Sequence, residues 1–491
     1  MTSQARSFLR WLSALVLAYL GLFMWVDGVV RLAAPLPPVP ISRGLAFLTI
    51  VLSLRIVWFH ERWAPGLSGA SLLGLVARWQ PLTVLLPCLF AGAWVIMSRY
   101  QPRHKTLLGH RLPIPWPVVL DPADRFLHLH VLGPTGSGKS SSVLMPLMAQ
   151  DIAQGHGVLV LEPKGDLSEA AYRRALACGR SVIRFDPGDA ECPHFNPLSG
   201  PADQAAEGLV WSLNQISSGG HPYYAVAARV RLLHAVRLIK EFHGENADIG
   251  HVLAFFRDGA LQRRMAQVSQ DSAAREYFQE QWARKVNASR EDQQGLINRL
   301  ELLWANPAVR RVLTGPADFT WDEVLQDRWV ILCPLSLAIL GESAKALGTL
   351  IWHGAAQAAY RRNPAISHHP FFIYLDEFYQ WVSDDLGDFL ALARGYAVGL
   401  VLAHQDMGQL SPALIQAVSA NARHRIIMPG SAAEDIRAFR QSADPFTVNA
   451  RLRYLARGRA ILQTTRNGRL MPPWLVRLPH YSLAQEGSNG L

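Results

Sequence analysis

One stretch of the sequence has the residue types and the spacing needed to hold a phosphate group. It follows the pattern G-x-x-x-x-G-K-S, known as a P-loop or Walker A motif. Glycines in such a loop let the backbone curl until its N–H groups face inward, and the helix that follows adds the positive end of its dipole. The predicted nucleotide-binding residues are Gly133, Pro134, Thr135, Gly136, Ser137, Gly138, Lys139, Ser140 and Ser141.

Two side chains of this loop have specific chemistry. Lys139 is expected to reach the β- and γ-phosphates of ATP, and the Ser140 hydroxyl is expected to coordinate Mg²⁺. A loop rich in Gly and Ser can also arise by chance. Here, however, an apolar strand is predicted before the loop, over 126–132, and a helix after it, from 139 to about 154. This context favours phosphate binding over a chance loop.

A pair of carboxylates follows an apolar run far downstream. FFIYLDEF, residues 371–378, is predicted to be a buried strand that ends in Asp376 and Glu377, the Walker B form. Asp376 would hold Mg²⁺ through water, and Glu377 would orient and deprotonate the attacking water. Alone, this pattern is often only a strand end before a capped helix. Together with the glycine loop it predicts an ATP hydrolase with ATP and Mg²⁺ as cofactors.

The next predicted strand, VGLVLAHQ, brings further polar side chains. Gln405, at its end, is a candidate sensor of the γ-phosphate, and the alternative is an amide that satisfies loop backbone. Arg394, just before the strand, is the candidate arginine finger that would neutralise charge on a neighbour's nucleotide, which requires a ring of subunits. Arg423 and Arg425 compete for this role, and a plain surface arginine is the alternative.

The order of the predicted elements indicates the fold. Apolar strands at 158–162, 181–186 and 329–333 alternate with helices, so we expect an α/β fold whose parallel sheet is covered on both faces. Between the second and third of these strands, apolar residues recur at three- and four-residue spacing, which predicts an inserted all-α domain. The predicted domains are a transmembrane region at 1–105, a P-loop (RecA-like) nucleotide-binding domain at 106–204 and 325–491, and the all-α insert at 205–324.

The first hundred residues carry most of the apolar excess of a chain that is 50% hydrophobic. The apolar runs are 11–30, 44–59 and 81–97, with a weaker one at 67–77, and the first is long enough to span a bilayer. We expect two to four transmembrane helices rather than a cleaved signal peptide. Arg6 and Arg10 favour a cytosolic N-terminus, and an ATP site must also lie in the cytosol, so an even number of spans is expected. Three spans fit only with the N-terminus outside.

Charge and cysteine content constrain the partners and the compartment. The net charge is +10, and residues 421–477 hold eleven Arg against three acids. This excess fits an ordinary solvated surface and a polyanion contact equally well. The four cysteines are scattered without C-x-x-C spacing, so they predict neither disulfides nor a zinc site and suit a reducing cytosol.

Taken together, the motifs resemble those of a known family. GPTGSGKSSSVLMP, EPKGDL, RFDPGDAECPHFNPLSG, YLDEF and LARGYAVGLVLAHQDMGQL follow one another in this order, behind a predicted membrane segment and around a predicted helical insertion. The set is similar to the type IV coupling proteins of conjugation, the TraG/TraD kind, which are relatives of the HerA/FtsK hexameric translocases. The resemblance runs from about Asp121 to the C-terminus, and EPKGDL and DP…FNPL are not general P-loop features.

The resemblance implies a multi-pass homo-hexamer in the bacterial inner membrane with its ATPase domain in the cytoplasm. Such a protein receives relaxase-bound single-stranded DNA (the relaxosome), or effector proteins, and passes it to components of a type IV secretion channel. The residues carried over are Lys139 and Ser140 for the nucleotide, Asp376 and Glu377 for Mg²⁺ and hydrolysis, Gln405 as sensor and Arg394 as finger.

Three features depart from the family pattern. The family commonly has Asp where Glu162 stands, the membrane part has more apolar runs than the usual hairpin, and no acidic C-terminal tail is expected after Leu491. Two other functions stay open. One is a secretion-gate adaptor that delivers effector proteins without pumping DNA. The other is a translocase of double-stranded DNA like FtsK or HerA, which the absence of an appended winged-helix domain disfavours.

Overall fold

A computed structural model of the chain describes residues 105–112, 115–216, 222–283, 287–363, 365–366, 368–382, 386–432, 435–436, 455–466 and 468–481. The predicted membrane runs 11–30, 44–59, 67–77 and 81–97 lie outside these residues. Within the part of the chain that the structure describes, no helix has the length and apolar character needed to cross a membrane.

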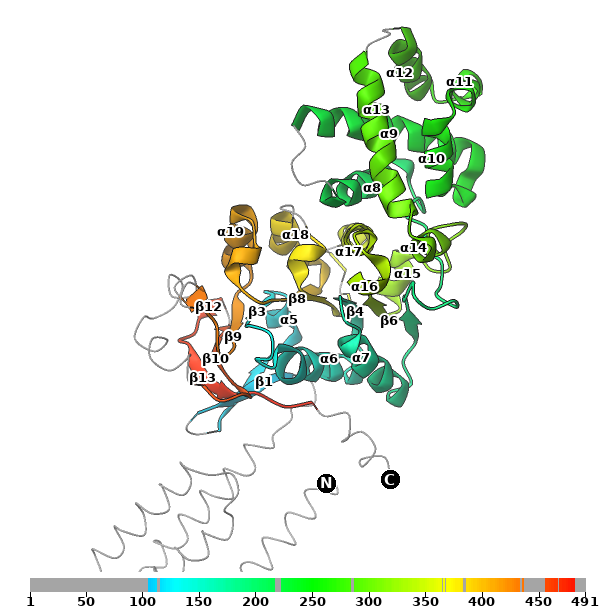
Figure 1. The fold of residues 1–491 in the computed structure, drawn as a ribbon. Helices are drawn as coiled ribbons and strands as arrows, with labels where there is room; N and C mark the ends of the chain where they lie inside the picture. Colours follow the sequence, from blue (N-terminus) through cyan, green and yellow to red (C-terminus); the bar gives the residue numbers. More distant parts are fainter. Residues whose placement is uncertain are drawn as a thin grey trace, which may run out of the picture. The chain divides into compact units, whose positions relative to one another are not determined.

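Most strands of the described residues belong to one eleven-stranded sheet. Their bounds are β1 Thr106–Arg111, β2 Pro117–Leu120, β3 Leu129–Leu132, β4 Gly157–Glu162, β5 Val182–Arg184, β6 Val330–Pro334, β7 Phe371–Asp376, β8 Val398–His404, β9 His424–Ile427, β10 Arg459–Gln463 and β13 Trp474–Arg477. The order across the sheet is β2-β1-β13-β10-β9-β3-β8-β7-β4-β6-β5 (Figure 1). From β9 to β5 every neighbouring pair is parallel, whereas β10, β13, β1 and β2 extend the sheet in antiparallel fashion.

Helices cover both faces of the parallel part, which explains its sequence pattern. Every residue of β4, β7 and β8 is buried, as expected for strands that read as continuous apolar runs. The covering helices are α6 Met145–Ala153 and α7 Asp166–Ala177 on one face, and α17 Ser343–Arg361, α18 Leu386–Leu392 and α19 Pro412–Asn421 on the other (Figure 1). The predicted α/β fold with a parallel sheet is therefore confirmed.

Helices also fill the sequence between β5 and β6. Their bounds are α8 Ala202–Ile216, α9 Pro222–His243, α10 Ile249–Arg257, α11 Gly259–Val268, α12 Ser272–Ala283, α13 Asn287–Trp304, α14 Pro307–Val312 and α15 Trp321–Gln326. α13 and α14 are separate because the Asn306 side chain accepts from the N–H groups of Ala308 and Val309, and Pro307 takes the first helical position. A short helix α16, Leu337–Leu340, precedes α17.

One predicted element differs in its bounds. The strand expected over 126–132 begins only at Leu129, because a one-turn helix, α5 Pro122–Arg125, occupies the approach and His128 has φ +58°. Near the C-terminus, two short strands form a separate two-stranded sheet. β11 Thr465–Arg466 pairs with β12 Arg469–Leu470 in antiparallel register.

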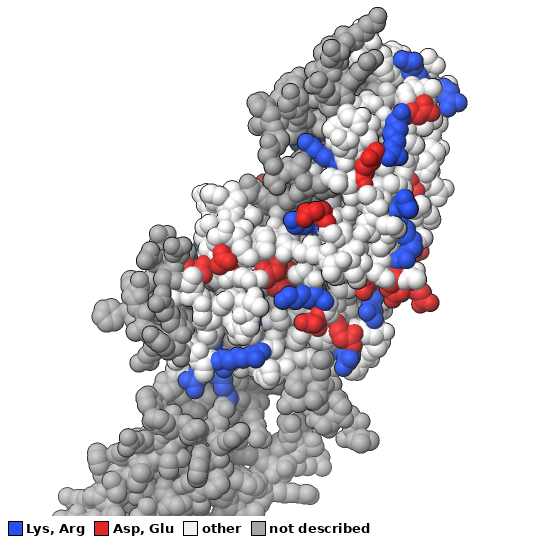
Figure 2. All heavy atoms as spheres, in the orientation of Figure 1, with Lys and Arg blue, Asp and Glu red and all other residues white. Residues whose placement is uncertain are grey.

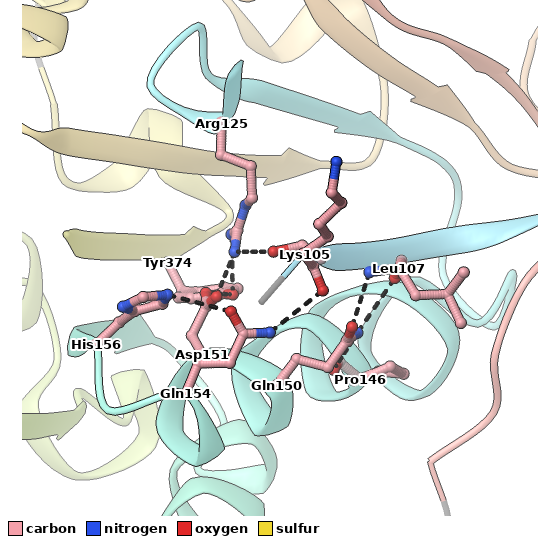
Figure 3. Close-up of polar contacts among 10 residues, drawn as sticks. Lys105, Leu107, Arg125, Pro146, Gln150, Asp151, Gln154, His156 and Tyr374 are labelled. Carbon is pink, nitrogen blue, oxygen red and sulfur yellow. Dashed lines mark hydrogen bonds and ion pairs between the residues drawn. The ribbon is translucent and has the colours of Figure 1, made fainter. Parts of the chain in front are cut away.

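A buried group of polar side chains joins α5, α6, β1 and β7, and we call it the Arg125 cluster (Figure 3). Arg125 forms an ion pair with Asp151, and it donates to Tyr374 Oη and Thr106 Oγ1 at 3.3 Å each. Tyr374 Oη donates to the second Asp151 oxygen at 2.5 Å, and the guanidinium lies 3.8 Å from the centre of the Phe372 ring. Burial alone would lower the pKa of Arg125, but Asp151 and Tyr374 raise it above its ordinary value.

Glutamine side chains on α6 and at its C-terminal cap attach the first described strand next to this cluster (Figure 3). Gln150 Oε1 accepts from Leu107 N at 2.8 Å, and Gln150 Nε2 donates to Leu107 O at 3.1 Å. Gln154 Nε2 donates to Lys105 O at 3.3 Å. The register of β1 on β2 is irregular between Leu107 and Gly109, so Gln150 bonds the backbone where the strand pairing is interrupted.

Candidate active site

The direction of the parallel strands brings the predicted site residues to one edge of the sheet. Leu132, the last residue of β3, pairs with His404 at the end of β8, and Asp376 at the end of β7 pairs with Ala403. The glycine loop, the two carboxylates and Gln405 therefore all follow strand ends at the carboxyl edge. This edge is where open α/β sheets bind ligands.

The backbone of the glycine loop has the conformation that its sequence predicts. Gly136 and Gly138 have φ values of +80° and +94°, which favour glycine. A Cβ atom at Gly133 would lie 2.4 Å from Met428 Cβ, so only glycine fits this close approach. After the loop, a π-helical turn, Ser140–Leu144, leads directly into α6.

Lys139 lies inside this site rather than in solvent. Its side chain is buried, and Nζ donates to Gly133 O of its own loop. Burial lowers the pKa of Lys139, and the negative charges of Glu377 and Asp376 oppose that shift. The lysine of the loop and the two carboxylates therefore interact electrostatically in the folded chain.

Asp376 is also buried and carries a strongly perturbed carboxyl group. The pKa of Asp376 is raised to about 6, mainly by burial and also by the neighbouring charges of Glu377 and Glu162, while the charge of Lys139 opposes this shift. Buried carboxyl groups with a raised pKa are common at sites that bind a cation or catalyse a reaction.

Glu377 is held in a strained position by a chain of hydrogen bonds. Its backbone is left-handed, with φ and ψ both 49°, which is uncommon for a residue with a side chain. Gln405 Nε2 donates to Glu377 Oε1 at 2.9 Å, and Thr135 Oγ1 donates to Gln405 Oε1 at 3.0 Å. Within the described residues, Glu377 Oε2 is buried and has no hydrogen-bond partner. One carboxylate oxygen is therefore fixed and the other is free to accept a proton.

The structure adds two residues of the EPKGDL segment that sequence reasoning did not nominate. Glu162 is buried at the end of β4, and its carboxylate accepts from Leu167 N at 3.1 Å and from Ser168 N, which caps the start of α7. The charge of Lys164 lowers the pKa of Lys139 further, beyond the effect of burial. The sequence contains a signal, because EPKGDL is one of the segments that resemble the family, but the segment alone assigns no chemistry to its side chains.

Arg394 does not lie with the other predicted residues. It belongs to the 3-10 turn Ala393–Tyr396 just before β8, is exposed, and interacts electrostatically with Asp124 of α5. Residues before a parallel strand lie at the amino edge of the sheet, opposite the glycine loop. The competitors Arg423 and Arg425 stand at the start of β9 and share this edge.

The residues at the carboxyl edge fit a magnesium–nucleotide complex. Ser137 Oγ and Ser141 Oγ are buried in the loop without partners among the described residues. In that part of the chain, no group of three or more His, Cys, Asp or Glu could hold a metal ion by itself. Mg²⁺ at this edge would therefore take oxygen ligands from the nucleotide and from the Ser140 hydroxyl as well as from Asp376, as is usual for this ion.

Solved structures with a similar fold include conjugative coupling proteins. The bacterial conjugative coupling protein TrwBΔN70, in an unbound form, matches with a TM-score of 0.58 and 15% identity over 80% of this chain and 92% of that chain. The plasmid coupling protein TrwB in complex with ADP and Mg²⁺ matches with a TM-score of 0.56, also at 15% identity and with the same coverage. VirB4 of Thermoanaerobacter pseudethanolicus matches with a TM-score of 0.52 and 13% identity over 79% of this chain and 99% of that chain.

Sequence comparison identifies the family. No curated protein sequence matches the chain. The family model of type IV secretory system conjugative DNA transfer proteins, however, matches residues 100–417, which include the glycine loop, both carboxylates and Gln405. The structural neighbours share this fold, and the chain belongs to the type IV secretory system conjugative DNA transfer family.

Proposed function

We propose that this protein is a membrane-anchored, hexameric ATPase that recruits relaxase-bound single-stranded DNA, or protein substrates, and couples ATP hydrolysis to their delivery to a type IV secretion channel. Membership of the family supports the role in conjugative transfer. One observation carries the ATPase part. Lys139 and the adjacent pair Asp376 and Glu377, which follow it by more than two hundred residues, interact in one buried site.

Each residue of the site has a role in this proposal. ATP supplies the γ-phosphoryl group that is transferred to water. Lys139 stabilises negative charge on the phosphates, and Ser140 and Asp376 hold Mg²⁺. Glu377 Oε2 accepts the proton of the attacking water, because Oε1 is already engaged by Gln405. Gln405 and Thr135 fix the carboxylate against the loop, so a change in the loop on nucleotide binding is passed to the general base.

The position of Arg394 determines how it would act as a finger. Because it lies at the amino edge of the sheet, Arg394 is on the wrong side to contact the nucleotide of its own chain. A finger role therefore requires a neighbouring subunit whose carboxyl edge faces this arginine, and that arrangement closes only in a ring. Arg423 shares the edge and is exposed, so it remains a competitor.

The remaining parts of the proposal concern the membrane and the cargo. Residues 1–105 anchor the protein in the bacterial inner membrane as a multi-pass region, and residues 205–324 form an all-α domain inserted into the nucleotide-binding domain. On the described residues of the face drawn in Figure 2, Lys and Arg are interspersed with Asp and Glu and do not form one basic strip. If the protein binds DNA through the phosphate backbone, binding is expected to fall steeply with salt.

The test is ATP hydrolysis by the full chain purified in detergent. Glu377→Gln should lower the turnover rate by about 10²–10⁴-fold, the usual contribution of a positioned base, and should leave ATP binding intact. Lys139→Ala should abolish binding as well as hydrolysis. Glu301→Gln, a matched change of an exposed glutamate that pairs with Arg257, is the control and should behave like the wild type. Wild-type hydrolysis by both site variants would refute the proposal.

The cargo requires a separate experiment in cells. A deletion strain should lose transfer of plasmid DNA, and complementation with Glu377→Gln should fail to restore it. Intact DNA transfer with loss of protein export would instead favour the secretion-gate adaptor.

A further inference from the structure

An arginine from the C-terminal part of the chain lies against the glycine loop. Arg457 belongs to the turn just before β10, more than three hundred residues after the loop. A Cβ atom at Gly138 would lie 3.6 Å from Arg457 Nε and 3.7 Å from Arg457 Cγ. The side chain of Arg457 therefore lies alongside Gly138, the residue before Lys139.

The sheet explains how this turn reaches the loop. β10 is antiparallel to β9, with Ile461 opposite Ile427 at the end of β9. The residues before β10 therefore lie at the carboxyl edge, together with the glycine loop. The turn is fixed there, because Gly458 has φ +82° and its carbonyl accepts from Leu478 N at 2.8 Å.

The segment after β13 reaches the same place independently. β13 is antiparallel to β10, with Arg459 opposite Arg477, so the chain leaves β13 at the carboxyl edge. There, Tyr481 N donates to Ser141 O, in the π-helical turn that follows the loop, at 2.9 Å. Two segments of the C-terminal strands thus contact the phosphate loop, and Arg457 is the charged side chain that they bring to it.

Among the described residues, the charge of Arg457 has no partner. The side chain is exposed, and within the described residues Arg457 forms no ion pair or side-chain hydrogen bond. A guanidinium offers five N–H donors in a planar fork that suits phosphate oxygens.

The strand order indicates which phosphates Arg457 can reach. Glu377 and Gln405 follow β7 and β8, on one side of β3, whereas Arg457 comes from β10, beyond β9 on the other side. The γ-phosphate has to face Glu377 and Gln405 for hydrolysis. The opposite side of the loop therefore flanks the part of the nucleotide that ATP and ADP have in common.

We propose that Arg457 is a nucleotide-binding residue of this site that donates to the α- or β-phosphate within its own chain. This inference rests on the proposed function as an ATPase and adds a binding group from the C-terminal strands. Because the contacted phosphates are present in ADP and in ATP, Arg457 stabilises the bound substrate and the transition state equally. Its removal therefore raises KM and leaves kcat unchanged.

The experiment measures nucleotide affinity in the full chain. Binding of ADP and of a non-hydrolysable ATP analogue is measured with Mg²⁺ for the wild type, Arg457→Ala and Arg457→Gln. The second variant retains part of the aliphatic stem beside Gly138 and removes the charge. Both variants should bind both nucleotides about tenfold more weakly, by the same factor, with an unchanged melting temperature without nucleotide. Arg459→Ala, which changes an exposed arginine two residues later at the start of β10, is the matched control and should bind like the wild type.

Three results would overturn the inference. Wild-type affinity in both variants would leave Arg457 only a packing role. A loss restricted to the ATP analogue, or a fall in kcat, would place the arginine at the γ-phosphate. Weaker binding in Arg457→Ala but not in Arg457→Gln would assign the effect to packing. Because ADP binding is measured directly, the result stands whether or not the wild type hydrolyses ATP, and Lys139→Ala tests hydrolysis separately.

Discussion

Two buried groups of charges lie two residues apart on strand β7, and they are built in opposite ways. Tyr374 belongs to the Arg125 cluster, in which Asp151 is engaged by both Arg125 and Tyr374. Asp376, on the same face of the strand, belongs to the candidate active site. There the pKa of Asp376 is raised to about 6 by burial, and Glu377 Oε2 has no partner among the described residues.

The difference separates the structural role from the functional one. A buried ion pair is tolerated when hydrogen bonds satisfy both partners, as in the Arg125 cluster, where the cation and the carboxylate compensate each other. A buried carboxylate without a cationic partner destabilises the folded state. Such groups are typical of functional sites, where a bound cation or a proton neutralises them. The Arg125 cluster holds α5 and α6 on the sheet. The candidate active site instead has carboxylate oxygens at the sheet edge that are available to bind a ligand.

Removal of one charge from the Arg125 cluster should have the largest effect on stability. Asp151→Leu leaves the guanidinium of Arg125 buried without its carboxylate, so we expect a loss of about 3–5 kcal/mol in the free energy of unfolding, measured by urea denaturation. The double variant Arg125→Met/Asp151→Leu removes both charges and should recover a substantial part of that loss. If the single and double variants were equally unstable, packing rather than charge would hold this cluster together.

In the active site, removal of a charge should stabilise the protein instead of destabilising it, and the pKa of Asp376 determines at which pH this occurs. In the folded chain this pKa is about 6, raised mainly by burial, against an ordinary value of 3.8. Between these two values the folded state binds more protons than the unfolded state, so the contribution of Asp376 to stability falls as pH rises through this window and stays low above it. At pH 8 the cost is on the order of 3 kcal/mol.

Asp376→Asn should therefore stabilise the protein at pH 8, without nucleotide or Mg²⁺, and should have little effect at pH 4. Urea denaturation at the two pH values measures the difference. Asp388→Asn, at an exposed position on α18, is the control and should change stability little at either pH. Equal effects of Asp376→Asn at both pH values would show that the carboxyl group is not strained by burial.

The sequence predicts the parts of this molecule that local patterns determine. Continuous apolar runs indicate β4, β7 and β8, because a strand covered on both faces has to be apolar throughout. Strand direction then places the glycine loop, Asp376 and Gln405 at one edge. The same rule places Arg394 at the opposite edge, so its separation from the site could have been derived from the sequence.

Contacts between distant segments could not be predicted in this way. His130 and His404 stack with their Nε2 atoms 2.7 Å apart, yet each is an isolated histidine in its own strand. Arg125 reads as a surface residue of a helical turn, although it is buried against Asp151 and Tyr374. Arg457 is one of many arginines in a basic tract, and only the pairing of β10 with β9 identifies it. These partners depend on strand order, which the local pattern does not contain.

The smallest predicted effect tests whether the two regions act independently. Gln150→Ala removes the two hydrogen bonds that hold Leu107 against α6, and we expect a loss of about 1–2 kcal/mol in the free energy of unfolding, because net values near 1 kcal/mol per hydrogen bond are typical. Gln154→Ala, which removes the more exposed bond to Lys105 O, is the matched control and should cost less than about 0.5 kcal/mol.

The Gln150→Ala variant also tests coupling between β1 and the active site. α6 continues directly from the turn that follows the phosphate loop, so a change in the packing of β1 on α6 has a direct structural route to the nucleotide site. If the regions are independent, ATP hydrolysis by Gln150→Ala stays within twofold of the wild type. A fall in hydrolysis that exceeds the loss of folded protein would instead show that β1, which follows the predicted membrane region, is coupled to the nucleotide site through α6.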